Sequence, residues 1–260
     1  MRSVTHSVLV VIGFIMICIA TPDRLIFAQK DRSIIHVTAS SGLDYTIAVI
    51  LTDSQGRRAG LLSVPANIGP EPIPGSITEI PNSSNGYDAI DDHVTGERSP
   101  GAFKIAISPS PLPGSYTLVV AGTVLTTYWV DIDTLNREAN RNTFTFKGVT
   151  DKNLKATYQL NYSPEPGTPT TAVRVSTFLS AKQDMDLAFR ADWIKNAGLK
   201  NSLAQKLSNA EAAQGRGDVT AASNILSAFL NEVKAQSGKG IDPDAETMLT
   251  QDAQYLIEHL

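Results

Sequence analysis

The spacing of apolar residues changes once along this chain, and the change predicts two different kinds of structure. Before about residue 162, apolar side chains recur at every second position, as they do from Leu154 to Tyr162. After about residue 182 they recur every three or four positions, as in Leu199, Leu203 and Leu207. The first spacing places side chains on one face of a β-strand, and the second places them on one face of an α-helix. We therefore expect a β domain followed by a helical domain.

The β region is expected to span residues 29–162. Alternating runs recur at Phe103–Ile107, Tyr116–Val120 and Tyr128–Ile132, and turn sequences such as Asp53–Gly56 separate them. Short strands joined by turns favour antiparallel sheets that pack face to face. The sequence therefore predicts an antiparallel β-sandwich, followed by a small helical bundle over residues 176–260.

The helical bundle carries recognisable start signals. Asp218 is a good N-cap for one helix, because its carboxylate can accept the free N–H groups of the first turn. Asp242 and Pro243 are typical of the cap and first position of the next helix. Between these signals Leu226, Phe229 and Val233 lie on one face, so we expect Phe229 at the centre of the bundle core. An earlier helix is expected from about Lys182 to Ile194.

A hinge is expected between the two domains, over residues 163–175. Its first part, Ser163–Thr170, consists largely of proline, glycine and threonine and offers no residue for a core. Such a composition is typical of a connecting segment. We therefore expect the two domains to fold independently of each other.

A short apolar run near the N-terminus is typical of an export signal. Residues 8–20 are apolar and follow Arg2, an arrangement characteristic of signal peptides. The run is shorter than the roughly 20 residues that a membrane-spanning helix needs. We expect a signal peptide over residues 1–28, cleaved after Ala20 or Ala28, which would also remove the single cysteine, Cys18. The mature protein is then expected to be secreted or held at the cell exterior, the periplasm included, without a membrane anchor.

The helical region resembles the FIMAH-type module found at the C-terminus of extracellular bacterial proteins. The resemblance rests on short runs of sequence along the whole region: Trp193–Gly198, Asn201–Leu203, Lys206–Leu207, Asn209–Ala210, Ala228–Val233, Ala235–Lys239 and Ala253–Ile257. It spans the whole module and implies a non-catalytic accessory unit. It supplies no ligand that can be assigned to particular residues.

The β region is similar to the Ig-like or pre-peptidase-type sandwich domains of secreted bacterial proteins. Asp53–Gly60 is similar to a turn of those domains, and Pro113–Thr123 is similar to one of their hairpins. Thr126 and Thr127 depart from the pattern, because the family often has glycine there. The resemblance implies a domain that accompanies enzymes or adhesins and is seldom catalytic.

Charge and motifs exclude several classes of function. The net charge is −4, which argues against binding to nucleic acid or to an anionic membrane surface. The chain has no nucleophile elbow, phosphate loop or dinucleotide fingerprint. His36, His93 and His259 are far apart in sequence and lack the spacing of a zinc site. We therefore expect a protein that is not an enzyme and has no cofactor other than, at most, calcium.

One acidic loop is a candidate calcium site. Asp88, Asp91, Asp92 and Glu97 lie within ten residues, and calcium binds several oxygen ligands on flexible loops. The alternative is a solvated acidic loop without a metal. Asp131 and Asp133 are spaced like part of a calcium loop, but the alternation predicts that they lie on the outward face of a strand.

The sequence leaves two functions open. The first is a non-catalytic secreted interaction or scaffold protein that binds an extracellular protein or glycan. The alternative is a carbohydrate-binding or calcium-stabilised adhesive module, or the remnant of a larger exported enzyme. Four tyrosines could line a sugar-binding face, but their spacing of two favours the sandwich core: Tyr116, Tyr128, Tyr158 and Tyr162.

Overall fold

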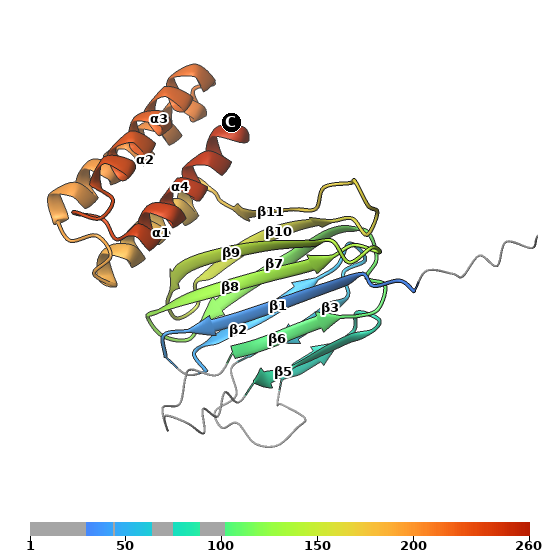
Figure 1. Ribbon diagram of the computed structural model, residues 1–260. Coiled ribbons are helices and arrows are strands. Elements are labelled where there is room, and N and C mark those ends of the chain that lie inside the picture. Colours follow the sequence, from blue (N-terminus) through green and yellow to red (C-terminus); the bar gives the residue numbers. More distant parts are fainter. Residues whose placement is uncertain (1–29, 44, 64–74, 89–101) are drawn as a thin grey trace, which may run out of the picture. The chain divides into compact units, whose positions relative to one another are not determined.

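The computed structural model describes residues 30–43, 45–63, 75–88 and 102–260 (Figure 1). The predicted signal peptide, residues 1–28, lies outside these residues. Residues 31–260 form one compact unit. In the part of the chain that is described, no helix is long and apolar enough to cross a membrane.

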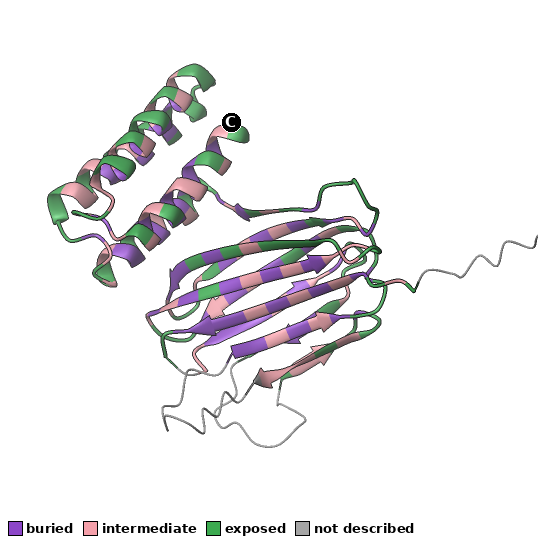
Figure 2. Cartoon of the chain, viewed as in Figure 1, coloured by how far each residue is buried: buried purple, intermediate pink, exposed green. Residues whose placement is uncertain are grey.

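Two antiparallel sheets form the sandwich that the alternation predicts. The first sheet has five strands in the spatial order β5 (Ser83–Asp88), β6 (Ala102–Ile107), β1 (Ile34–Ser41), β8 (Thr126–Leu135) and β9 (Arg141–Thr150). The second has six strands in the order β11 (Thr171–Val175), β10 (Lys155–Tyr162), β7 (Gly114–Gly122), β2 (Ile47–Thr52), β3 (Arg58–Leu61) and β4 (Ser76–Thr78). Buried and more exposed residues alternate along the strands, as Figure 2 shows, so each sheet turns one face to a shared core.

The four tyrosines belong to this core. Tyr116, Tyr128, Tyr158 and Tyr162 are each no more than 3% exposed, which confirms the core position that their spacing favours. Buried hydroxyl groups need hydrogen-bond partners. The Tyr116 hydroxyl donates to the Leu112 carbonyl at 2.7 Å, and the Tyr162 hydroxyl donates to the Leu135 carbonyl at 2.9 Å. A sugar-binding face built from these rings is therefore excluded.

The turn between β2 and β3 is organised by the Asp53 carboxylate. This group accepts hydrogen bonds from the backbone N–H groups of Gln55 and Arg57, both at 2.9 Å, and from Arg57 Nε at 2.7 Å. Burial by itself would raise the pKa of Asp53, but the hydrogen bonds from Arg57 and Gln55 outweigh it and lower the pKa. Gly60 lies just beyond, in β3, where β2 passes so close that no Cβ fits.

The helical bundle consists of α1 (Phe178–Arg190), α2 (Ala197–Gly215), α3 (Val219–Gln236) and α4 (Pro243–Glu258). The predicted caps are confirmed, because Asp218 accepts from the Ala221 N–H and Asp242 accepts from the Asp244 N–H. Phe229 is 1% exposed in the bundle core, as expected.

The first helix begins and ends earlier than the sequence predicts. Thr177 and Ser180 form a capping box that starts α1 at Phe178, whereas the apolar spacing predicted a start near Lys182. Ile194, the predicted last residue, lies beyond the helix and forms a β-bridge with Ile241. Ile194 is nevertheless buried in the bundle core. Its apolar side chain therefore indicated a core position and not a helical backbone.

The second half of the predicted hinge is a strand. Residues 171–175 form β11, which pairs with β10 at the edge of the second sheet. Helices α1 and α4 pack against the sandwich at β9, and α4 also packs against β11. The short strand escapes the sequence pattern because an arginine, Arg174, occupies one of its inward positions. These contacts join the two parts, and independent folding of the two parts stays a prediction.

Candidate functional site at the sandwich–helix junction

Arg174 is the centre of a buried polar cluster between the sandwich and the helices. Its side chain extends from β11, the last strand before α1, and the residue is 3% exposed. We call the group of residues around it the Arg174 cluster: Arg174, Tyr128, Tyr158, Ser176, Asp184 and Asp252.

On the sandwich side the guanidinium contacts two tyrosine hydroxyls. Arg174 Nη1 donates to Tyr158 Oη at 2.8 Å and to Tyr128 Oη at 3.2 Å. The two hydroxyl oxygens are 2.8 Å apart and share a further hydrogen bond. Arg174 Cζ also lies 5.5 Å from the centre of the Tyr158 ring, within the range of a cation–π contact. These tyrosines come from β8 and β10, so Arg174 contacts both sheets.

On the helical side the guanidinium contacts two carboxylates. Arg174 Nη2 donates to Asp184 Oδ2 on α1 at 2.6 Å, and Arg174 Nε donates to Asp252 Oδ1 on α4 at 2.8 Å. The Ser176 hydroxyl also donates to Asp252 Oδ1. One side chain therefore joins two strands of the sandwich to two helices.

Burial controls the protonation of the cluster. Burial would lower the pKa of Arg174, but the Asp184 carboxylate and its other neighbours raise it well above the ordinary value. For Asp252 burial is the largest influence, and it raises the pKa to about 7 against the attraction of Arg174. Burial likewise raises the pKa of both Tyr128 and Tyr158. Each nitrogen of this buried guanidinium donates to a neighbour, so the side chain holds the elements around it in place.

Two further ion pairs join the sandwich to the helices. Lys147 Nζ on β9 lies 2.9 Å from Asp244 Oδ1 on α4. Arg190 Nη2, at the end of α1, lies 2.7 Å from Asp151 Oδ2. Both pairs are partly exposed to solvent, so each contributes little stability compared with a buried contact.

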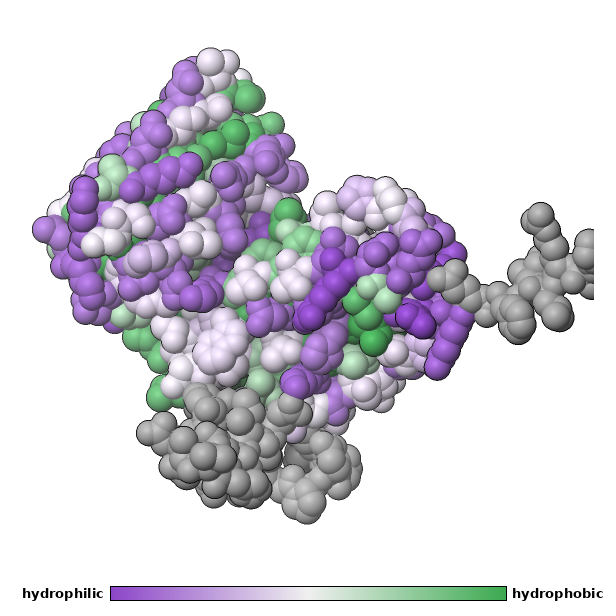
Figure 3. All heavy atoms as spheres, in the orientation of Figure 1, coloured by the Kyte–Doolittle hydropathy of each residue, from purple (hydrophilic) through white to green (hydrophobic). Residues whose placement is uncertain are grey.

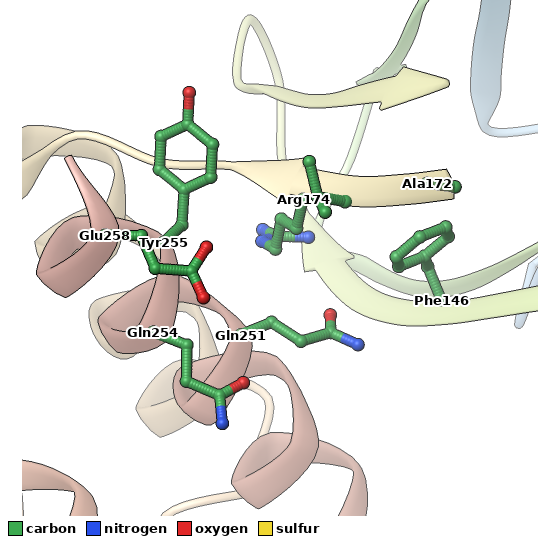
Figure 4. Close-up of a pocket in the computed structure, with 8 residues that line it drawn as sticks. Phe146, Ala172, Arg174, Gln251, Gln254, Tyr255 and Glu258 are labelled. Atoms are coloured by element: carbon green, nitrogen blue, oxygen red, sulfur yellow. The ribbon is translucent and has the colours of Figure 1, made fainter. Parts of the chain in front are cut away.

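A cleft of about 200 Å³ opens beside the cluster. Its lining combines aromatic, amide and charged side chains from β9, β11 and α4: Phe146, Ala172, Val173, Arg174, Gln251, Gln254, Tyr255 and Glu258. Figure 4 shows Gln251 extending from α4 toward the side on which Phe146 and Ala172 lie. The Tyr255 ring stacks on His259, with 3.9 Å between the ring centres. The lining thus combines hydrogen-bonding groups with aromatic rings, a combination that is typical of ligand-binding clefts.

The predicted calcium residues fall mostly beyond the described part of the chain. Asp91, Asp92 and Glu97 lie outside the described residues, as does His93. Asp88 is the last residue of β5, opposite Ala102 of β6. Calcium at this loop therefore stays a prediction. Among the described residues, no three histidine, cysteine, aspartate or glutamate side chains gather at one place.

Asp131 and Asp133 lie on β8, where their carboxylates contact neighbouring side chains of β9. Asp131 accepts from the Thr145 hydroxyl and Asp133 accepts from the Thr143 hydroxyl, both at 2.6 Å. Arg141 adds an ion pair to Asp133 at 2.8 Å. Both aspartates alternate with the buried residues Val130 and Ile132, which confirms the outward face of a strand that the alternation predicts.

Sequence reasoning missed the Arg174 cluster because its members look ordinary in their own segments. Two signals were available. Arg174 occupies a buried position of a strand that is only five residues long, where an apolar residue is usual. Asp252 stands beside Ala253 in the middle of the apolar stripe of α4, where an acidic residue requires a buried partner.

Comparison with known proteins assigns the helices and leaves the sandwich unassigned. No curated protein and no solved structure matches the chain. Residues 180–258 match the family model of the FIMAH domain. The matched segment includes Asp184 and Asp252, whereas Arg174 and Ser176 precede it. The resemblance seen in the sequence is thus confirmed for the helical region: residues 180–258 match a FIMAH domain that is joined to a β-sandwich.

Proposed function

We propose that this chain is a non-catalytic interaction or scaffold protein of the bacterial cell exterior, in which the sandwich carries the FIMAH-like helices as an accessory module. The observation that carries the proposal is that the buried charged side chains contact one another across the junction. Arg174, Asp184 and Asp252 join α1 and α4 to the sandwich, and each nitrogen of the guanidinium donates to a neighbour inside the cluster. The role that follows is to hold two binding surfaces in a defined arrangement.

The finer assignments belong to the same proposal. The sandwich would be of the Ig-like or pre-peptidase type, on the basis of the Asp53–Gly60 turn and the Pro113–Thr123 hairpin. The protein would act after export, on an extracellular protein or glycan, and without nucleic acid or membrane contact. The visible face of the helices in Figure 3 is largely hydrophilic, which suits a module exposed to solvent.

Glycan binding is the second candidate, and the cleft favours it. Amide and carboxylate groups hydrogen-bond to sugar hydroxyls, and aromatic rings pack against the apolar faces of sugars. The cleft offers Gln254 and Glu258 beside Tyr255. This candidate includes the calcium-stabilised adhesive module, which depends on the acidic loop.

Binding and turnover measured on the same polymers test both candidates. The purified mature chain is mixed with bacterial cell-wall preparations and insoluble polysaccharides, and the bound fraction and the released sugar ends are quantified. We expect saturable binding to cell-wall material without release of products. Release that grows with protein concentration would contradict the non-catalytic proposal.

A pair of variants separates the two candidates. Gln254 and Glu258 are exposed, so the double variant Gln254→Ala/Glu258→Ala keeps the fold. Binding to a polysaccharide should fall in this variant if the cleft is the glycan site, and should persist in the control Lys234→Ala on α3. Equal binding by both variants would reject the cleft as the glycan site and leave the interaction proposal standing.

A further inference from the structure

The Arg174 cluster has more potential negative charge than positive charge. Among the described residues it contains one guanidinium and two carboxyl groups, Asp184 and Asp252, which are 7% and 1% exposed. The nearest ion pairs outside it satisfy their own members, Lys147 with Asp244 and Arg190 with Asp151. If both carboxyl groups were ionised, the cluster would carry a net charge of −1 away from water. Such a charge is costly to bury.

The hydrogen bonds show where a proton would be held. Asp252 Oδ1 accepts from Arg174 Nε and from the Ser176 hydroxyl. Asp252 Oδ2 is buried and has no hydrogen-bond partner within the described part of the chain. A bare carboxylate oxygen in that position would lack both water and a donor. An O–H group at Oδ2 removes the charge and leaves both contacts of Oδ1 intact.

The groups that face Asp252 come from every element around it. The sandwich contributes the guanidinium of Arg174, which also donates to the hydroxyls of Tyr128 and Tyr158, and α1 contributes Asp184. On α4 itself, Gln251 has a buried Oε1 without a partner among the described residues. Among the described residues, Arg174 and Ser176 alone donate to Asp252, and Asp184 repels its ionised form.

We propose that Asp252 is protonated while the helices are docked on the sandwich, and that losing this proton loosens α1 and α4 from β9 and β11. The contact between the helices and the sandwich is then more stable at acidic pH than at basic pH.

The direction of the effect follows from the raised pKa. Burial raises the pKa of Asp252 to about 7 in the folded protein, whereas an unfolded aspartate titrates near 4. The stabilisation is complete below the unfolded value and is lost as the pH rises through about 7. Within this range the unfolding constant should increase by up to about tenfold for each pH unit.

Carbon-13 NMR of the full chain, labelled at its aspartate carboxyl groups, measures the proton directly. In a titration from about pH 4 to about pH 9 we expect one carboxyl signal with a midpoint near neutrality. That signal should be absent from Asp252→Asn, whose amide imitates the protonated acid. If every aspartate of the unmodified chain titrates below about pH 5, the proposal is wrong.

Urea unfolding then tests the coupling to stability. Between about pH 5.5 and about pH 7.5 the unfolding constant of the unmodified chain should rise by more than about tenfold. Asp252→Asn should lose this rise, whereas the matched control Asp244→Asn, which removes the exposed ion pair on the same helix, should keep it. An equal rise in Asp252→Asn would overturn the proposal that this proton stabilises the junction. If Asp252→Asn does not fold, the NMR titration of the unmodified chain decides alone.

Discussion

At the residue scale, the stability of the junction depends on Arg174, whose guanidinium contacts both the sandwich and two helices. Burying a charge is unfavourable unless its partners are well placed, and removing one partner leaves the others without compensation. The partners here are two carboxyl groups and two tyrosine hydroxyls. A substitution at Arg174 should therefore cost far more than the loss of an exposed arginine.

Arg174→Ala should destabilise the full chain by about 3–5 kcal/mol, because it leaves Asp184 and Asp252 unpaired inside the junction. The free energy of unfolding in urea is the measurement. Arg141→Ala is the control, since its ion pair with Asp133 lies on the surface, where the arginine side chain is 63% exposed. If both variants lose equally little stability, the cluster does not hold the junction together.

A second residue-scale prediction concerns the close approach of β2 and β3. Gly60 has φ +133°, and a Cβ there would lie 2.2 Å from the Val49 carbonyl oxygen. Gly60→Ala should therefore separate the two strands and lower the melting temperature by more than Gly56→Ala does. Gly56 also has a positive φ, +78°, but open space around it, so alanine there costs only the backbone strain of about 1–2 kcal/mol. Similar losses in the two variants would show that β2 and β3 can separate at little cost.

At the element scale, strong periodicity and helix caps could be predicted from the sequence. The strands around Tyr116 and Tyr128 and the helices that follow Asp218 and Asp242 are confirmed, because local side-chain chemistry determines them. The start of α1 and the strand β11 were missed. Thr177 acts as a cap only through its reciprocal bonds with Ser180, and β11 is held by a neighbour strand and a buried arginine.

The candidate site was the least predictable part of the molecule. Asp184 and Asp252 are more than sixty residues apart and meet because α1 and α4 pack against each other and against β9. No spacing rule within one segment identifies such a pair. The acidic loop, by contrast, is obvious in the sequence because its members are neighbours, and its calcium remains a prediction.

The packing of α3 gives an element-scale prediction. Phe229→Ala should cost about 3–5 kcal/mol, because a fully buried aromatic side chain leaves a cavity in the bundle core. Circular dichroism should show helix loss at a lower temperature than in the unmodified chain. Val219→Ala on the same helix is the control, since Val219 is 49% exposed. An unchanged melting curve for Phe229→Ala would mean that the bundle core does not depend on this ring.

At the scale of the whole molecule, we expect the sandwich and the helices to unfold as one unit. The cluster links β8, β10 and β11 with α1 and α4. The edge strand β9 lies against both of these helices, and β11 lies against α4. The segment Ser163–Thr170 can still be cut or lengthened without breaking these contacts, because none of them passes through it. Coupling between the two parts is therefore a property of the junction and not of the connecting segment.

Unfolding followed at both ends of the junction tests this claim most directly. The chain has two tryptophans, Trp129 in the sandwich and Trp193 in the helical region, so Trp193→Phe leaves fluorescence that reports on the sandwich alone. Circular dichroism reports on the helices in the same urea titration. We expect the two signals to change together at one urea concentration. Adding Arg174→Ala should move the two transitions to different urea concentrations. Helices that unfold from a native sandwich while Arg174 is present would contradict this expectation.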